Sequence, residues 1–206
     1  MPTETKKEAG SEYRLLPEDY FQKLSADEVF PGGELFEVDL GCGDGGFVTA
    51  MAEHYPERKF LAVERLLGRV RKVCRKAKRL GLNNLKVLRL ESAYTAGWLL
   101  PDEGVSRLHL LCPDPWPKKR HHRRRLIYDT DFQSGLLRVL ADEGEFLFKT
   151  DHAEYYEEAE EVIGNMPGLE RLPWDDNAFY YPQTDFEKQW LDEGRTMQRA
   201  RWVKPS

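Results

Sequence analysis

The sequence lacks the features of several protein classes. It has no apolar run approaching the roughly 20 residues of a membrane-spanning helix. Residues 1–10 are polar and contain no apolar core of a secretory signal peptide. Its three cysteines, Cys42, Cys74 and Cys112, are far apart and show no metal-binding spacing. These absences predict a cytoplasmic protein with reduced thiols, no membrane association and no metal site.

Internal repeats and low-complexity linkers are also absent, so 206 residues favour a single folded domain. We expect residues 1–30 to form an N-terminal extension that is partly disordered, and residues 31–206 to form the domain itself. The net charge of −5 excludes indiscriminate nucleic-acid binding. Residues 65–79, however, contain eight Lys or Arg and no acid, which indicates a local basic surface.

Short apolar segments alternate with helical patterns along most of the chain. The segments expected to be strands are residues 35–40, 59–64, 85–90, 105–112 and 145–150. The segments expected to be helices are residues 47–54, 66–80, 129–140 and 152–163. This alternation predicts an α/β fold, a doubly wound and mostly parallel sheet with helices on both faces.

A glycine-rich turn, Gly41-Cys42-Gly43-Asp44-Gly45, follows the first expected strand and leads into the first helix. In open α/β sheets ligands bind at this edge, beyond the carboxyl ends of the strands. Glu64 ends the second strand, where a carboxylate can accept hydrogen bonds from both hydroxyls of a ribose. With Gly46 the turn also fits the dinucleotide pattern G-x-G-x-x-G, so an NAD(P)-dependent oxidoreductase remains an alternative.

Two further acids favour a different nucleoside. Asp39 lies two residues before the glycine turn, and Glu91 follows the third strand. A carboxylate beneath the turn repels a pyrophosphate but suits a ligand that carries an ammonium and a sulfonium group. We therefore predict S-adenosyl-L-methionine, with Asp39 near the methionine part, Glu64 on the ribose and Glu91 near the adenine amine. The alternative is that these acids cap helices or are simply exposed.

The segment Pro113-Asp114-Pro115-Trp116-Pro117 follows the fourth expected strand and precedes six Lys or Arg within residues 118–125. Prolines restrict the backbone, so the loop should be stiff. A carboxylate and an indole beside a basic arm suit a base carried by a nucleic acid, although a solvated basic turn is the simpler alternative. Trp116 could stack on the base or pack under the loop, and His121 and His122 could contact phosphates.

Three segments, Asp39–Gly45, Pro113–Arg125 and Thr184–Glu187, together resemble the bacterial tRNA (guanine-N7-)-methyltransferases. The resemblance extends from about residue 36 to the C-terminus. It implies a Rossmann-like class I S-adenosylmethionine-dependent methyltransferase domain. It also implies an RNA-binding enzyme of tRNA modification that forms N7-methylguanosine at position 46 of the tRNA variable loop. We expect activity without a protein partner, as a monomer or homodimer.

The resemblance assigns roles to individual residues. The cofactor-binding positions would be Asp39, Gly41, Gly43, Gly45, Glu64, Glu91 and Asp114, of which Asp114 would also be catalytic. The substrate-binding positions would be Lys118, Asp151, Thr184, Asp185, Phe186 and Glu187. The basic run adds Lys119, Arg120, Arg123 and Arg124 as contacts to the tRNA backbone.

The chain departs from the family pattern at Asp185, where a basic residue is common, and at Glu91, where Asp is more frequent. Thr184 could alternatively be a plain helix N-cap. Two further alternatives are a methyltransferase acting on an amino group of a base and a non-catalytic RNA-binding module. The first usually carries Asn/Asp-Pro-Pro-Tyr/Phe rather than the Asp-Pro-Trp-Pro found here, and the intact acids argue against the second.

Overall fold

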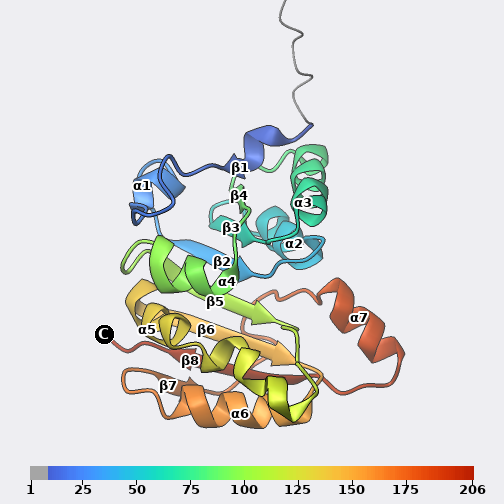
Figure 1. The fold of residues 1–206 in the computed structure, drawn as a ribbon. Helices are drawn as coiled ribbons and strands as arrows, with labels where there is room; N and C mark the ends of the chain where they lie inside the picture. The colour runs from blue at the N-terminus through green and yellow to red at the C-terminus, as the bar shows by residue number, and fades with distance from the viewer. Residues whose placement is uncertain (1–8) are drawn as a thin grey trace, which may run out of the picture.

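The computed structural model describes residues 9–206, which form one eight-stranded sheet in the order β1-β4-β3-β2-β5-β6-β8-β7. Figure 1 shows the sheet running through the molecule with helices on either side. The predicted parallel strands are present as β2 (Phe36–Leu40), β3 (Lys59–Val63), β4 (Leu85–Leu88), β5 (Val105–Leu111) and β6 (Leu140–Thr150). The doubly wound, mostly parallel α/β sheet is therefore confirmed.

The helices cover both faces. Buried residues of α2 (Gly46–His54) and α3 (Leu67–Leu80) form one core cluster, against one face of the sheet. Buried residues of α5 (Thr130–Val139) and α6 (Ala153–Gly164) form the other. Shorter helices are α1 (Ala26–Val29), α4 (Ser92–Tyr94), which runs into a π-helix over Thr95–Leu99, and α7 (Asp185–Asp192).

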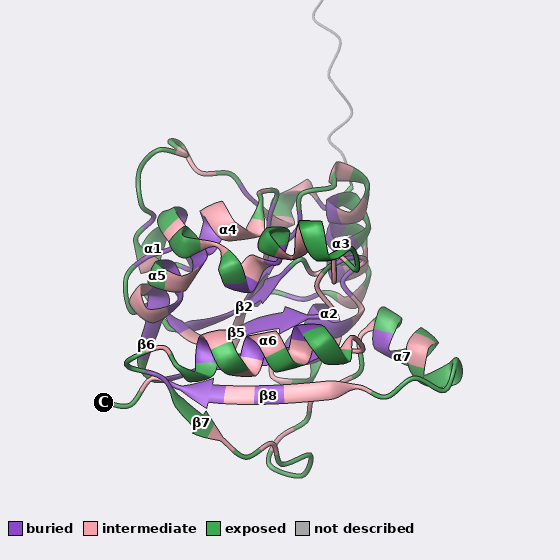
Figure 2. Cartoon of the chain, turned by 60° about the horizontal axis from the view of Figure 1, so that its bottom comes forward, coloured by how far each residue is buried: buried purple, intermediate pink, exposed green. Residues whose placement is uncertain are grey.

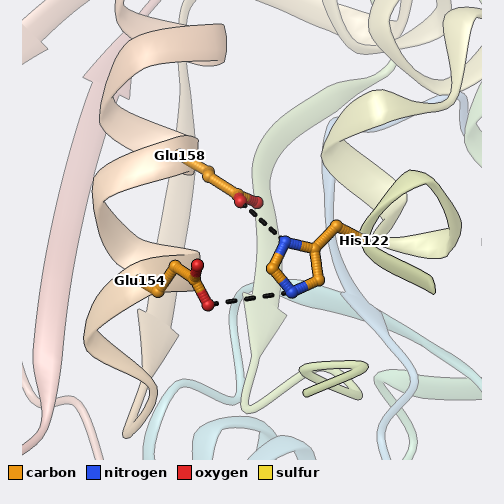
Figure 3. A group of neighbouring side chains, drawn as sticks. All are labelled: His122, Glu154 and Glu158. Atoms are coloured by element: carbon orange, nitrogen blue, oxygen red, sulfur yellow. Dashed lines mark hydrogen bonds and ion pairs between the residues drawn. The ribbon is translucent and has the colours of Figure 1, made fainter. Parts of the chain in front are cut away.

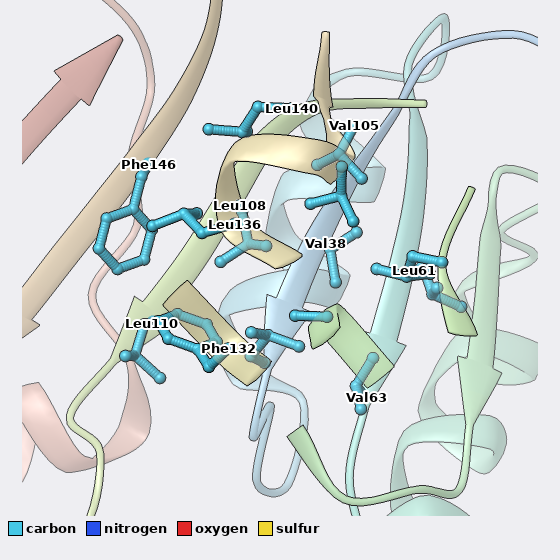
Figure 4. Close-up of a cluster of buried hydrophobic side chains, with 14 of the residues drawn as sticks. Val38, Leu61, Val63, Val105, Leu108, Leu110, Phe132, Leu136, Leu140 and Phe146 are labelled. Atoms are coloured by element: carbon cyan, nitrogen blue, oxygen red, sulfur yellow. The ribbon is translucent and has the colours of Figure 1, made fainter. Parts of the chain in front are cut away.

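The sheet's central strands are buried on both faces because apolar side chains fill both layers. Phe132 and Leu136 of α5 pack on Leu108 of β5 and Phe146 of β6 (Figure 4). In Figure 2 the central strands are buried along most of their length, whereas the helices expose their outer faces. This rigid layer fixes the positions of the loops at its edge.

Three strands were not anticipated. β1 (Arg14–Leu15) lies parallel to β4, β8 (Gln198–Val203) lies antiparallel to β6, and β7 (Glu170–Leu172) lies antiparallel to β8. The expected extension thus adds a strand to the sheet, and its Leu15, Leu24 and Phe30 are buried in the core. A 3-10 helix already begins at Ser11. The rest of the segment expected to be partly disordered, residues 1–8, lies outside the described residues.

No helix between residues 9 and 206 is both long enough and apolar enough to cross a bilayer.

Candidate active site

The carboxyl ends of the central strands bring the predicted acids together. Leu40 of β2 is in register with Val63 of β3 and Leu110 of β5, so the loops after these strands leave the sheet at one level. A cavity of about 490 Å³ lies there. Its lining includes Gly41, Glu64, Glu91, Asp114 and Trp116. The structure therefore unites residues that the sequence separates widely.

A second cavity, of about 160 Å³, adjoins the first and shares Gly41, Arg69 and Phe186 with it. It is lined by Asp39, by the glycine turn and by the first residues of α7. Figure 1 places α7 beyond the arrowheads of β5 and β6, over this edge of the sheet. Because the two cavities share these lining residues, they lie side by side and together make up the candidate site.

The glycine turn adopts a backbone that other residues rarely take. Gly41, Gly43 and Gly45 have φ values of 74°, 58° and 77°. A Cβ on Gly45 would lie 2.8 Å from Cγ2 of Val73 on α3, so this glycine permits the close packing of α3 on the turn. Among residues 9–206, a Cβ on Gly41 would meet no atom within 4 Å and would instead project into open space. The turn thus leaves room for a ligand to approach its backbone.

Asp39 is only 4% exposed, and burial together with the nearby Glu64 raises the pKa of its carboxyl group to about 7. Glu64 is buried too, but Oε1 accepts a hydrogen bond of 2.8 Å from the backbone N–H of Leu66. Oε2 of Glu64 lies 3.6 Å from Nη1 of Arg69. A cation that binds beside Asp39 would remove the penalty that burial places on its charge.

Glu91 shows the helix-capping alternative directly. Its Oε2 accepts a 2.9 Å hydrogen bond from the backbone N–H of Tyr94 and so caps α4. The same side chain is exposed and lines the larger cavity. Capping holds the carboxylate at the cavity wall, so the two interpretations are compatible.

The loop that follows β5 contains Asp114 and is called the Asp114 loop. It carries two non-glycine residues with positive φ, Cys112 at 53° and Trp116 at 44°. Such conformations are costly and cluster at functional sites. The backbone N–H of Cys112 is held by the carbonyl of Lys149 at 2.8 Å, and the N–H of Trp116 lies 3.4 Å from Oδ1 of Asp114. Asp114 is exposed at the cavity.

Trp116 is half-buried. The guanidinium of Arg124 lies 5.1 Å from its ring centroid, and the ring centroid of His121 lies 5.9 Å from it in a T-shaped arrangement. The indole thus packs within the loop and also lines the cavity.

The basic run folds into two short 3-10 helices, Lys119–Arg124 and Leu126–Tyr128. Most of its basic side chains are exposed, namely Lys118, Lys119, Arg120, Arg123 and Arg124. His122 differs, because its Nδ1 lies 3.1 Å from Oε1 of Glu158 on α6 (Figure 3). The ring of His122 is thus engaged by α6, and its contact with phosphate stays a prediction.

His122, Glu154 and Glu158 also offer three metal-ligand atoms within 4.8 Å of one another. The guanidinium of Arg125 already lies among them. It donates to Glu158 and, at 3.2 Å, to Nε2 of His122. The guanidinium already supplies a positive charge beside both carboxylates, and we assign no metal to the group.

The segment that begins at Thr184 reaches the site through α7. Oγ1 of Thr184 accepts a 2.9 Å hydrogen bond from the backbone N–H of Glu187, which is the N-cap of the alternative interpretation. Asp185 and Phe186 line the smaller cavity. Asp185 lies against the start of α2, because a Cβ on Gly46 would be 2.5 Å from its Oδ1.

Two predicted substrate residues are engaged within the protein. Glu187 is buried and forms an ion pair with Lys149, whose Nζ lies 2.6 Å from Oε1. Asp151 accepts a 2.7 Å hydrogen bond from Arg195. Their proposed roles toward a substrate stay predictions.

Sequence reasoning missed Lys149 and Arg125. Lys149 lies in an otherwise apolar strand, and a lysine there requires a buried partner, which was a usable signal. Arg125 is hidden in a uniformly basic run. Sequence reasoning also missed His109 of β5. Nε2 of His109 lies 2.9 Å from Oε2 of Glu37, and Nδ1 lies 2.8 Å from the hydroxyl of Tyr181. Tyr181 thereby fixes the segment leading to α7.

Comparison with known proteins identifies the relatives of this chain. The profile of a family described as "Putative methyltransferase" matches residues 34–200. A tRNA (guanine-N(7)-)-methyltransferase of Syntrophotalea carbinolica is 31% identical over 193 residues, which cover 92% of this chain and 83% of the relative. An enzyme of the same name from Staphylococcus epidermidis is 41% identical over 152 residues, covering 68% of this chain and 70% of the relative.

Among solved structures, the aminoglycoside resistance methyltransferase NpmB1 superposes with a TM-score of 0.61 at 19% identity, over 88% of this chain and 94% of that one. At this identity the likeness concerns the fold, and it supports the Rossmann-like methyltransferase architecture.

Proposed function

The chain belongs to the family of tRNA (guanine-N(7)-)-methyltransferases, and from this premise we propose that it methylates N7 of guanine at position 46 in the variable loop of tRNA. The observation that carries the proposal is the shared cavity. Glu64 and Glu91, two of the proposed cofactor-binding residues, line the same cavity as Asp114 and Trp116.

The residues at the strand ends fit S-adenosylmethionine. When bound, this cofactor supplies a methyl group on a positively charged sulfur. Asp39 would hold its ammonium group, Glu64 its ribose hydroxyls and Glu91 the adenine amine. The open space at Gly41 allows the backbone of the turn to approach the ligand. A cavity of about 490 Å³ lies within the usual size range of small-molecule sites.

Asp114 would act on the base. Guanine N7 carries a free lone pair in the ring plane, so no proton has to leave before methyl transfer and a general base is not required. The purine becomes positively charged during transfer, and a fixed carboxylate stabilises that charge. The same carboxylate can accept hydrogen bonds from N1–H and N2–H of guanine. Adenine lacks this donor pair, so Asp114 would also select the base.

The RNA would be held by the exposed basic side chains that follow Asp114. Lys118, Lys119, Arg120, Arg123 and Arg124 would contact backbone phosphates, in keeping with their exposure. Thr184, Asp185 and Phe186 line the cavity beside the glycine turn, and we propose that they orient the base or the cofactor. Asp151 and Glu187 would act mainly by holding Arg195 and Lys149 in place.

We further propose that the enzyme works in the cytoplasm without a protein partner, as a monomer or homodimer. Cys42, Cys74 and Cys112 form no disulfide within residues 9–206, which fits a reducing compartment.

The test is to incubate the purified protein with methyl-labelled S-adenosylmethionine and unmodified tRNA transcripts, followed by nucleoside analysis and mapping. N7-methylguanosine at position 46 is the expected product. A matched transcript with adenine at that position should accept no label. Label at another base would contradict the assigned specificity, and label on neither transcript, despite cofactor binding, would contradict the proposed reaction. Molar mass in solution, measured on the active sample, decides between monomer and homodimer.

A further inference from the structure

Arg125 is unlike its neighbours in the basic run. Arg123 and Arg124 are exposed, whereas Arg125 is only 1% exposed and is among the largest fully buried side chains of the described residues. An arginine keeps its charge when buried, so it has to be paired. Its partners reveal what this residue does.

The guanidinium of Arg125 connects the Asp114 loop to α6. Its Nε donates a 2.8 Å hydrogen bond to the carbonyl of Pro115. Its Nη1 donates to Glu158 of α6, and the group lies 4.9 Å from the ring centroid of Tyr155 on the same helix. One side chain thus ties the loop to a helix that packs against the sheet.

His122 completes this connection (Figure 3). A guanidinium can only donate, so Nε2 of His122 accepts the 3.2 Å hydrogen bond from Nη2 of Arg125. Nδ1 therefore carries the hydrogen that is donated to Oε1 of Glu158 at 3.1 Å. Arg125, His122 and Glu158 form a closed triangle in which each side chain contacts the other two.

We propose that Arg125 is a positioning residue for Asp114, held by Glu158 and acting through the carbonyl of Pro115. This carbonyl belongs to the peptide bond that joins Pro115 to Trp116, whose φ is 44°. The hydrogen bond from Arg125 fixes the plane of that peptide bond and so stabilises a left-handed conformation that Trp116 would not adopt by itself. The N–H of the same peptide bond points toward Oδ1 of Asp114.

The basic run therefore has two tasks. Its exposed members are free to meet an RNA backbone, whereas Arg125 faces inward and shapes the loop. This inference rests on the proposed function for the role of Asp114, but the anchoring of the loop can be measured without any enzymatic activity.

The experiment compares Arg125→Met, Glu158→Gln and the double variant, with Arg123→Met as the matched control from the exposed part of the run. Loop mobility is measured as the rate of trypsin cleavage after Lys119 and Arg120, which are unchanged in every variant. Activity is measured as kcat and KM for tRNA, with the salt dependence of KM. Thermal unfolding reports overall stability.

We expect Arg125→Met to raise the cleavage rate about tenfold, because the loop opens locally once its anchor is lost. We expect kcat to fall between about tenfold and a hundredfold through misplacement of Asp114, with KM for tRNA and its salt dependence nearly unchanged. Arg123→Met should have the opposite pattern. Because Arg123 is exposed and would contact the RNA backbone, its loss should change KM for tRNA and the salt dependence of KM, while kcat and the rate of loop cleavage stay the same.

The double variant separates positioning from charge balance. Arg125→Met leaves the half-buried carboxylate of Glu158 without its cation, and Glu158→Gln should recover the thermal stability. The bond to Pro115 remains absent, so kcat should stay low and cleavage fast. Recovery of kcat in the double variant would overturn the positioning role. Unchanged cleavage in Arg125→Met would overturn the anchoring itself. If the unaltered protein failed to methylate tRNA while Arg125→Met accelerated cleavage, the anchoring would stand and the proposed function would fail.

Discussion

Nζ of Lys149 lies 2.6 Å from Oε1 of Glu187, and both side chains are buried, so an internal ion pair joins the end of β6 to α7. The pair is surrounded by aromatic rings, because Nζ also lies 5.3 Å from the ring centroid of Tyr181 and 5.7 Å from that of Trp174. Since α7 forms one wall of the smaller cavity, the pair holds that wall in place.

Removing one partner of this pair should be more damaging than removing both. Glu187→Leu leaves the ammonium of Lys149 buried and unpaired, which costs about 3–5 kcal/mol in comparable cases. Urea unfolding should show a loss of this order, and the double variant Lys149→Met/Glu187→Leu should recover most of it. Lys188→Ala, on the exposed side of the same helix, is the control and should change the unfolding free energy little. An additive loss in the double variant would contradict the coupling.

Asp39 should destabilise the free protein at neutral and alkaline pH. The pKa of its carboxyl group is about 7 in the folded protein, against 3.8 for an unperturbed aspartate. As pH rises from 4 to 7 the unfolded chain releases this proton first, so stability falls over that window and stays lower above it. Asp39→Asn should therefore raise the unfolding free energy at pH 8 and change it little at pH 4. The gain at pH 8 is at most about 4 kcal/mol, because each unit of pKa shift corresponds to about 1.36 kcal/mol. Urea unfolding at the two pH values provides the measurement, and an equal effect at both would contradict it.

Cofactor affinity should depend on the same proton. An ammonium group beside Asp39 favours the ionised carboxylate, so below pH 7 binding must displace a proton. The dissociation constant for S-adenosylmethionine should rise toward tenfold for each pH unit below 7 and level off above it. Calorimetry in buffers of different ionisation enthalpy would detect proton release near pH 6 that diminishes as the pH approaches ~7.5. Asp39→Asn should bind weakly at every pH, and a pH-independent affinity in the unaltered protein would sink this assignment.

Asp114→Ala should lower turnover far more than cofactor affinity. Loss of a group that stabilises charge in the transition state typically costs on the order of a hundredfold in kcat. Single-turnover methylation of tRNA measures the effect, and equilibrium binding of S-adenosylmethionine measures the affinity. Asp114→Asn keeps the shape but carries no charge, so it should be nearly as slow as alanine if charge matters most. Full turnover in Asp114→Ala would exclude the proposed role.

Replacement of Lys118, Lys119 and Arg120 by alanine should weaken tRNA binding and flatten its salt dependence. Each lost phosphate contact reduces the slope of log affinity against log salt concentration by about 0.9 for a duplex. Filter binding at several salt concentrations provides the slope. Alanine variants of Arg75 and Lys78 serve as the comparison, because these residues are exposed on α3 and carry charges of the same sign. An unaltered slope in the triple variant would place the RNA surface elsewhere, and a larger effect at α3 would identify it.

The central strands could be predicted because both of their faces are buried, which leaves short apolar runs in the sequence. The acids at their ends could be placed for a related reason, since parallel strands finish at one edge of the sheet. β1 and β7 escaped prediction because two or three residues carry no periodicity. In β8, the buried Ala200 and Trp202 alternate with partly exposed residues, but this short alternation comes at the end of a charged segment and is a weak signal by itself.

The partners of individual side chains could not be predicted from the sequence, for a different reason. Nothing local distinguishes Arg125 from Arg124, because burial of one and exposure of the other follow from where α6 packs. The partner of Glu187 was equally hidden, because only the fold places Lys149 beside it. Pairings between residues that are 33 or 38 positions apart depend on the assembled layers rather than on spacing.

The placement of β8 has a consequence for synthesis on the ribosome. This strand lies between β6 and β7 but is translated after both of them. While it is still in the exit tunnel, β7 has no neighbour to pair with and β6 has an open edge. The segment that carries α7 is then attached at only one end, so the ligand-binding cleft should mature late, after the parallel half of the sheet has already folded.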